Sequence, residues 1–176
     1  MAQMAALPIV RYPDARLRQK SQDVVSFDDE LRKLVTDMAE TMYAAEGAGL
    51  AAIQVGAPLR MFLIDAGVAG RPVTDPPLVF INPEMVSISD ESQNGDEGCL
   101  SFPGIFVPVK RGLRAVMRAT DLEGNTFTVE GEGLYARALQ HELDHLTGRL
   151  LIDMVGPVKR EIIKRKMKKE AAAEAR

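Results

Sequence analysis

Residues 133–148 read GLYARALQHELDHLTG and predict a helix that begins after Gly133 and ends near Gly148. Leu139, Leu143 and Leu146 recur at helical spacing, which indicates that one face of this helix is buried. A glycine suits the position just after a helix, where the backbone often turns left-handed. The segment is the strongest fold signal in the chain, and the rest of the sequence is organised around it.

The same helix carries an HExxH pattern, His-Glu-Leu-Asp-His at 141–145. Residues four apart lie on one helix face, so His141 and His145 can hold one metal ion together. Glu142 can reach a water activated by that metal and act as a general base. Such a short pattern also occurs by chance in unrelated helices, but both histidines of this chain fall within it. We therefore interpret it as part of a metal site.

A third protein ligand is needed for a typical catalytic site with one open position. No histidine follows His145, and the next carboxylates are poorly suited: Asp153 lies at the helix exit and Glu161 in a basic tail. The remaining candidate is the only cysteine, Cys99, because a thiolate with two imidazoles suits Zn(II) or Fe(II). Taken alone, a single cysteine is more often a small buried hydrophobe, so both interpretations stay open.

The remaining elements predict an α+β fold with small mixed or antiparallel sheets around the central HExxH helix, flanked by N-terminal and C-terminal helices. Asp28 is a plausible N-cap for a helix over 28–44, and Pro157 suits the first turn of a final helix. Strand-like runs lie at 61–65, 78–81, 85–89, 114–120 and 126–130.

Composition points to one domain over 1–176, with a basic helix at 157–176. The chain is 46% hydrophobic and 27% charged, which suits a buried core and a soluble surface. No apolar run approaches the roughly 18 residues of a membrane span, and the N-terminal stretch lacks a signal-peptide pattern. We therefore expect a cytoplasmic protein with no membrane partner.

Charge is unevenly distributed along the chain. From Pro157 onward eight Lys or Arg residues stand against three Glu, whereas the preceding residues hold 14 basic and 22 acidic side chains. The acidic body argues against DNA binding. For the tail we expect Ile162, Ile163 and Met167 to bury one narrow face, leaving a basic face that is either merely solvated or docks on ribosomal RNA.

Three segments together resemble a known family. GAGLAAIQ at 47–54, EGCLS at 97–101 and QHELDH at 140–145 are similar to the three signature motifs of peptide deformylases, in the same order and at similar spacing. The likeness extends from VRYPDARLR at 10–18 to the basic C-terminal helix. It implies metal-dependent hydrolysis of the N-formyl group from the N-terminal formylmethionine of nascent polypeptides, with release of formate.

The resemblance implies a ligand set and a proton carrier. Cys99, His141 and His145 would bind one divalent metal ion. The family usually works best with Fe(II), and the same ligands also accept Zn(II). Glu142 would take a proton from the attacking water and later pass it to the leaving amine.

It also implies roles around that centre. The Gln54 side chain and the Leu100 backbone N–H would stabilise the negative charge that develops on the formyl oxygen. Arg111 matches the position expected to pair with Glu97 and so hold the cysteine-bearing segment.

For substrate binding, the resemblance implies close backbone approach at the glycine loop and an apolar pocket for methionine. Ala48 stands where the family more often carries a larger aliphatic residue, and Arg137 where relatives are often apolar or variable, so both bear on substrate fit. The residues expected to contact formylmethionyl peptides are Gly47, Ala48, Gly49, Gly98, Leu134 and Ala138.

Two other functions remain as alternatives. The first is an HExxH metallopeptidase that cleaves internal amide bonds. This function is disfavoured because the present sequence has no conventional third metal ligand downstream of His145. A catalytically silent relative that only binds peptide or ribosome is disfavoured because a binder has little need for Glu142.

Overall fold

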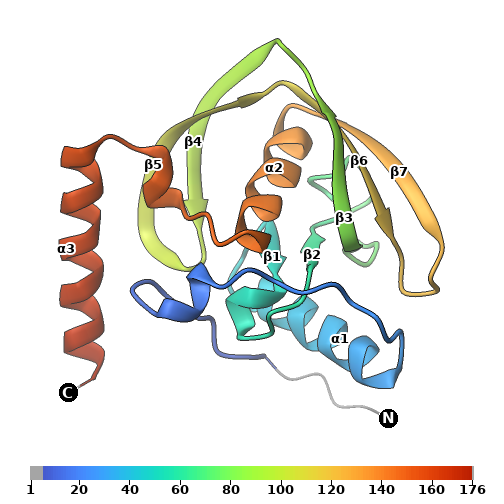
Figure 1. Ribbon diagram of the computed structural model, residues 1–176, viewed down its shortest axis with the longest axis horizontal. Helices are drawn as coiled ribbons and strands as arrows, with labels where there is room; N and C mark the ends of the chain where they lie inside the picture. Colours follow the sequence, from blue (N-terminus) through green and yellow to red (C-terminus); the bar gives the residue numbers. More distant parts are fainter. Residues whose placement is uncertain (1–5, 176) are drawn as a thin grey trace.

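Helix α2 (Leu134–Leu146) lies in the middle of the computed structural model, with strands on either side (Figure 1). Its C-cap is Thr147, and the following Gly148 has a φ of 80°. A Cβ at position 148 would come within 2.4 Å of the Arg18 carbonyl oxygen, so only glycine satisfies both the backbone conformation and the space. The predicted central helix is confirmed.

The structure describes residues 6–175. Residues 1–5, at the start of the N-terminal stretch that lacks a signal-peptide pattern, lie outside this range, as does Arg176 at the end of the predicted basic helix.

One sheet has five antiparallel strands in the order β1-β2-β3-β6-β7. Within residues 6–175, the short strand β1 lies at one edge of this sheet and pairs with β2 alone. The strands are β1 (Gly49–Ala51), β2 (Met61–Ile64), β3 (Leu78–Ile88), β6 (Arg114–Thr120) and β7 (Thr126–Glu132).

Strand β3 joins two runs that the sequence predicts as separate strands, 78–81 and 85–89. The pairing of β3 with β6 shifts register between Ile81 and Glu84. Asn82 has a φ of 48°, and Pro83 has no N–H to donate, so the ladder is interrupted while the chain continues in the same direction. The break that the sequence indicates is a local irregularity within one strand.

A second sheet consists of the hairpin β4 (Ser92–Cys99) and β5 (Phe102–Gly112), which the sequence analysis does not predict. Strand β4 contains no alternating apolar residues, and β5 contains two prolines and two glycines that suggest a loop. Nevertheless Ile105, Val107 and Val109 alternate inward on β5 and are buried. This hairpin delivers Cys99 to the centre of the molecule.

Helix α1 (Asp29–Ala44) begins as predicted, because the Asp28 side chain accepts a hydrogen bond from the Leu31 backbone N–H at 3.0 Å. Three short 3-10 helices, η1 (Ala15–Arg18), η2 (Ala52–Val55) and η3 (Leu151–Met154), connect the larger elements.

Helix α3 (Pro157–Glu174) has Pro157 in its first turn and stands at the side of the molecule next to β5 and η3 (Figure 1). Ile163 and Met167 are buried, but Ile162 is 62% exposed, so the expectation that Ile162 joins the buried face is wrong. Successive helical residues point about 100° apart, and the face shared by Ile163 and Met167 is the one that meets the body.

Three apolar clusters hold these elements together. One packs α2 on the five-stranded sheet, a second packs α1 on β1–β3, and a third joins β5, η3 and α3. Helix α2 is therefore fixed by its packing on the large sheet on one side, and by polar contacts to the β4–β5 hairpin on another. No helix in residues 6–175 is long and apolar enough to cross a membrane.

Candidate active site

A cavity of about 600 Å³ opens between the segment before β1, the β4–β5 hairpin and α2. It brings together the three sequence motifs that lie far apart along the chain. Most of the predicted site residues line it: Gly47, Ala48, Gly49, Gln54, Glu97, Gly98, Cys99, Leu100, Leu134, Ala138, His141 and Glu142. His145 and Arg111 lie behind it, around a much smaller cavity that His141 also lines.

The predicted metal donors converge in this cavity. The Cys99 Sγ and ring nitrogens of His141 and His145 all lie within 4.8 Å of one another. Cys99 Sγ is 3.5 Å from His145 Nε2, and the ring centroids of His141 and His145 are 5.1 Å apart. Helix α2 places the histidines one above the other, and the end of β4 brings the cysteine to them. The three donors fit one ion, because soft thiolate and imidazole ligands suit Zn(II) or Fe(II).

The charges in the cluster favour the ligating form of the cysteine. Burial alone would raise the pKa of the Cys99 thiol, but the imidazoles of His145 and His141 beside it lower that pKa to about 5. Burial lowers the pKa of His141, whereas its contacts with Cys99 and Glu97 raise it, and the net direction is upward. The thiolate that a metal requires is therefore stabilised by its surroundings.

Glu97 sits at the back of this cluster and joins it to Arg111. Arg111 forms a bidentate ion pair, with Nε and a terminal nitrogen each 2.8 Å from a Glu97 oxygen. The His141 Nδ1 is 2.8 Å from Glu97 Oε1. Burial raises the pKa of Glu97, but hydrogen bonds from Arg111 and His141 bring it down to about 2. Because Glu97 holds Nδ1, the Nε2 of His141 is left free for a metal.

Arg111 has a second partner that the sequence analysis does not identify. Its other terminal nitrogen is 2.8 Å from a carboxylate oxygen of Asp144. Asp144 lies inside the HELDH motif, so its position next to His145 was the available signal.

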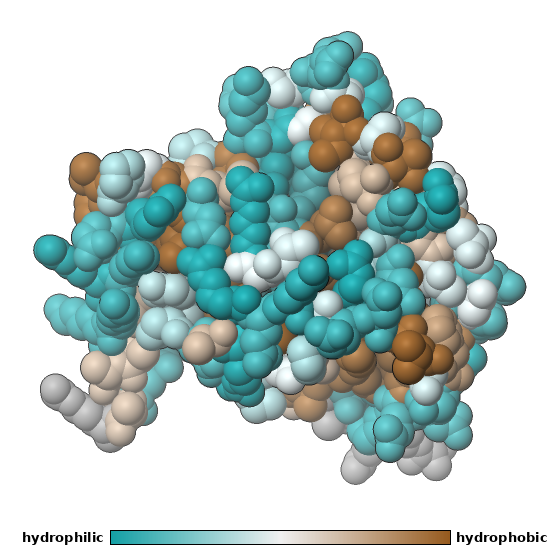
Figure 2. All heavy atoms as spheres, in the orientation of Figure 1, coloured by the Kyte–Doolittle hydropathy of each residue, from teal (hydrophilic) through white to brown (hydrophobic). Residues whose placement is uncertain are grey.

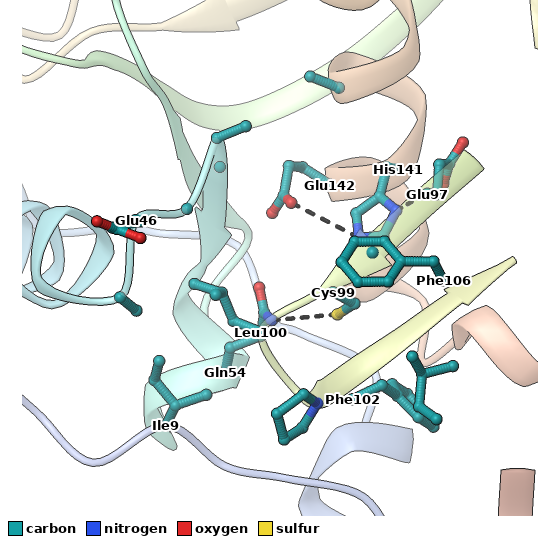
Figure 3. A pocket seen from close by; sticks show the side chains of 18 of the residues that line it. Ile9, Glu46, Gln54, Glu97, Cys99, Leu100, Phe102, Phe106, His141 and Glu142 are labelled. Carbon is teal, nitrogen blue, oxygen red and sulfur yellow. Dashed lines mark hydrogen bonds and ion pairs between the residues drawn. The ribbon is translucent and has the colours of Figure 1, made fainter. Parts of the chain in front are cut away.

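Glu142 points from α2 toward His141 (Figure 3), and the residue is only 4% exposed. Oε1 is 3.9 Å from His141 Nε2, and Oε2 has no hydrogen-bond partner in the described part of the chain. Burial raises the pKa of Glu142. A Cβ at Gly49 would lie 3.1 Å from this carboxylate, so the backbone at the start of β1 approaches it closely. A buried carboxylate oxygen without a partner is suited to receive a water.

The amide of Gln54 is fixed by three hydrogen bonds. Its Oε1 accepts a hydrogen bond from the Ala51 N–H at 3.0 Å, and its Nε2 donates to Ser101 Oγ at 3.1 Å. Nε2 also points toward Cys99 Sγ at 3.5 Å (Figure 3). Ser101, which the sequence analysis does not single out, donates in turn to the Val10 carbonyl at 2.7 Å. The donor end of Gln54 therefore faces the cysteine in a fixed orientation.

The guanidinium of Arg137 is bound to the β4–β5 hairpin at the edge of the cavity. Arg137 lines the cavity but is only 7% exposed, and one terminal nitrogen lies 2.6 Å from Glu97 Oε2 and 3.0 Å from the Val109 carbonyl. Ala48 lines the cavity with a small side chain, and its carbonyl accepts a hydrogen bond from the Asp65 N–H.

Several residues of the cavity wall carry no sequence motif and were missed, among them Ile9, Glu46 and Phe106. Phe106 is 68% exposed, and its ring packs over Gly98, where a Cβ would come within 2.7 Å of it. The only available signal was an aromatic residue at an outward position of a strand that the sequence analysis does not recognise.

A Cys/His/His donor cluster beside a buried carboxylate, at a cavity, is the arrangement typical of metal-dependent hydrolases. Residues 6–161 match the family described as Polypeptide deformylase. The chain belongs to this family, whose members use a single divalent metal, and it is a hydrolase that removes the N-formyl group from nascent peptides.

Relatives match along nearly the whole chain. A peptide deformylase of Brucella suis is 44% identical over 172 residues, covering 98% of this chain and 97% of that protein. Peptide deformylase 1 of Burkholderia multivorans is 48% identical, covering 94% and 90%. The crystal structure of a peptide deformylase from Legionella pneumophila is similar with a TM-score of 0.89 at 42% identity, covering 98% of this chain and 99% of that one.

Proposed function

We propose that Glu142, Gln54 and Leu100 carry out the deformylation at a metal centre formed by Cys99, His141 and His145. The observation that carries this proposal is the convergence of the three donors within 4.8 Å beside the buried Glu142 carboxylate. A bound divalent ion would act as a Lewis acid toward the water and the formyl carbonyl. Glu97 and Arg111 support the centre by orienting His141.

Glu142 is the general base and then the general acid of this reaction. It takes a proton from the attacking water and delivers it to the amine that leaves when the C–N bond of the formamide breaks. Its unpartnered Oε2 is available to that water. Burial raises its pKa, which makes the ionised carboxylate a stronger base than an exposed one.

Gln54 Nε2 and the Leu100 N–H donate to the formyl oxygen as it gains negative charge. In support, Gln54 Oε1 accepts a hydrogen bond from the Ala51 N–H, and Gln54 Nε2 is directed toward Cys99 Sγ and Ser101 Oγ. Leu100 follows Cys99 directly and lines the same cavity. A preorganised donor of this kind is typically worth about 3 kcal/mol in the transition state.

The substrate backbone runs beside Gly47, Ala48 and Gly49, extending the sheet at its free edge. This is supported by the position of β1 as an edge strand, where unpaired backbone groups can add a peptide strand. The methionine side chain enters the part of the cavity that Leu134, Ala138 and Gly98 line. An unbranched, flexible thioether fits such an apolar slot.

The native metal is Fe(II), with Zn(II) as a weaker substitute. The donor set accepts both ions, and the choice rests on the resemblance to the family. Metal analysis of protein purified without oxygen, combined with turnover after reconstitution, tests this assignment. If Zn(II) supports full turnover and Fe(II) adds nothing, the assignment is wrong.

The enzyme acts in the cytoplasm, where α3 docks on the ribosome near emerging chains. Lys159, Arg165, Lys166, Lys168 and Lys169 are exposed on α3. Figure 2 shows mostly hydrophilic side chains over the face of this helix that it presents. A cluster of cations attracts the phosphates of RNA in a salt-dependent way.

The reaction class is tested by comparing two products. Formate release from formyl-Met peptides, without amine release from internal bonds of unblocked peptides, is expected of the deformylase. The opposite pattern would indicate an HExxH metallopeptidase, and neither product would indicate a silent binding protein.

A further inference from the structure

Arg137 lies one helical turn before His141 on α2 and reaches across to the β4–β5 hairpin. It is 7% exposed. A single terminal nitrogen contacts Glu97 Oε2 at 2.6 Å, the Val109 carbonyl at 3.0 Å and the Gly95 carbonyl at 3.3 Å. One side chain of α2 is therefore bound to both strands of the hairpin.

The two oxygens of Glu97 divide their donors evenly. Oε2 receives Arg111 Nε and Arg137, whereas Oε1 receives the other arm of Arg111 and His141 Nδ1. Without Arg137, Oε2 would keep one donor, and the carboxylate plane would be set by Arg111 and His141 alone. Because His141 is oriented by the same carboxylate, a tilt of Glu97 turns the imidazole with it.

This contact joins the two segments that carry the donor cluster. Glu97 lies two residues before Cys99 on β4, and Arg137 lies four residues before His141 on α2. Other polar contacts from α2 reach β5, from Gln140 to Gly112 and from Asp144 to Arg111. Within residues 6–175, the ion pairs from α2 to β4 are those of Arg137 and His141, and both fall on Glu97.

The guanidinium of Arg137 is buried but only partly hydrogen-bonded. Its second terminal nitrogen is buried without a partner in the described chain and points toward Gly95, where a Cβ would lie 3.1 Å away. A buried ion pair often stabilises a fold no better than apolar residues of the same volume would. Stability alone therefore does not account for a buried arginine with an unused donor at this point.

From these contacts we infer that Arg137 is a positioning residue of the metal site. Through Glu97 it sets the orientation of His141 and the distance between Cys99 and the two imidazoles. The inference rests on the proposed metal centre, and it assigns to Arg137 a role in metal binding that a lining residue of the methionine pocket would not have.

The test uses Co(II) binding to the full-length protein, with Arg137→Met to remove the guanidinium at similar length. We expect Co(II) affinity, measured by competition with a chelator, to fall about tenfold or more, and the visible Co(II) spectrum to shift. Arg160→Met is the matched control, because Arg160 also binds two backbone carbonyls, Ile152 and Val155, away from the site. It should leave affinity and spectrum unchanged.

Gly95→Ala provides a second, independent variant. The added methyl crowds the Arg137 guanidinium without removing its charge, so the single variant Gly95→Ala should bind Co(II) more weakly than the wild type. Added to Arg137→Met, the same change should have no further effect on Co(II) binding. It also decides the matter if Arg137→Met does not fold.

Wild-type affinity and spectrum in folded Arg137→Met, even with a lower melting temperature, would overturn the inference and leave Arg137 as a structural brace. If Arg137→Met does not fold, wild-type Co(II) binding in Gly95→Ala has the same consequence. If the wild-type protein itself does not bind one Co(II) per chain, the proposed metal centre is wrong, whatever the role of Arg137.

Discussion

His141 Nδ1 lies 2.8 Å from Glu97 Oε1, so the carboxylate of one sequence motif orients the imidazole of another. The same carboxylate is paired with Arg111, and Glu97 as a residue is only 5% exposed. The donor cluster therefore depends on a buried charge network and not only on its three ligands.

The Glu97 network predicts a loss of stability in acid. Glu97 has a pKa of about 2 when folded, below its ordinary value of 4.5, so its stabilising contribution is present above pH 4.5 and is lost as pH falls toward 2. The contribution is of order 3 kcal/mol at neutral pH. The difference in unfolding free energy between wild type and Glu97→Gln should shrink over this interval. A difference that stays constant from pH 6 to pH 2.5 would contradict the assignment.

Cys99→Ser should weaken metal binding and remove thiolate-to-metal charge transfer from the Co(II) spectrum. The reason is that Cys99 Sγ is the sulfur donor of a cluster whose other members are imidazoles. Absorption spectroscopy of Co(II)-substituted protein checks this. If the wild-type protein shows no such band, Cys99 is a structural residue.

Gly49→Ala should lower kcat while leaving metal content unchanged. The added methyl would sit 3.1 Å from the Glu142 carboxylate, so it should displace the proposed base but not the ligands. A decrease of about tenfold to a hundredfold is expected, because small misplacements of a reacting group are costly. Gly156→Ala is the control, since a Cβ there meets open space. Equal kcat in both variants would exclude close contact between the loop and the base.

Removing charge from α3 should reduce ribosome binding without affecting hydrolysis of a short peptide. Salt-sensitive co-sedimentation with ribosomes measures the first, and formate release the second. In the α3 variant, four residues are changed to Gln: Arg165, Lys166, Lys168 and Lys169. The control removes the same number of exposed charges from the body: Lys20, Arg71, Lys110 and Arg118. Unchanged co-sedimentation of the α3 variant would leave this helix as a solvated cap.

The sequence predicts the helices and most of the large sheet because their signals are local. Asp28 caps α1, Gly148 ends α2 and Pro157 begins α3, each by backbone chemistry that a few neighbouring residues determine. The hairpin β4–β5 could not be predicted in this way. Its inward residues alternate, but two prolines, two glycines and a polar partner strand obscure the pattern.

The candidate site divides along the same line. His141, Glu142 and His145 are contained in one short motif, so local spacing predicts that they meet, whereas Cys99 is placed with them only by the resemblance to the family. The bonds of Arg137 to Glu97 and Val109 span 40 and 28 positions and follow no motif. The pairing of Arg111 with Glu97 is expected from the resemblance, but the second arginine on this carboxylate is brought there by the packing of α2 against the hairpin, which only the folded chain displays.

Formate release from a formyl-Met peptide measures whether Glu142 is the base of a metal-dependent deformylation. Metal-loaded wild-type protein is compared with Glu142→Gln. We predict metal-dependent turnover in the wild type, and a decrease of roughly 10² to 10⁴-fold or more in the variant at unchanged metal content. Near-normal turnover by Glu142→Gln with one metal bound per chain would contradict the claim.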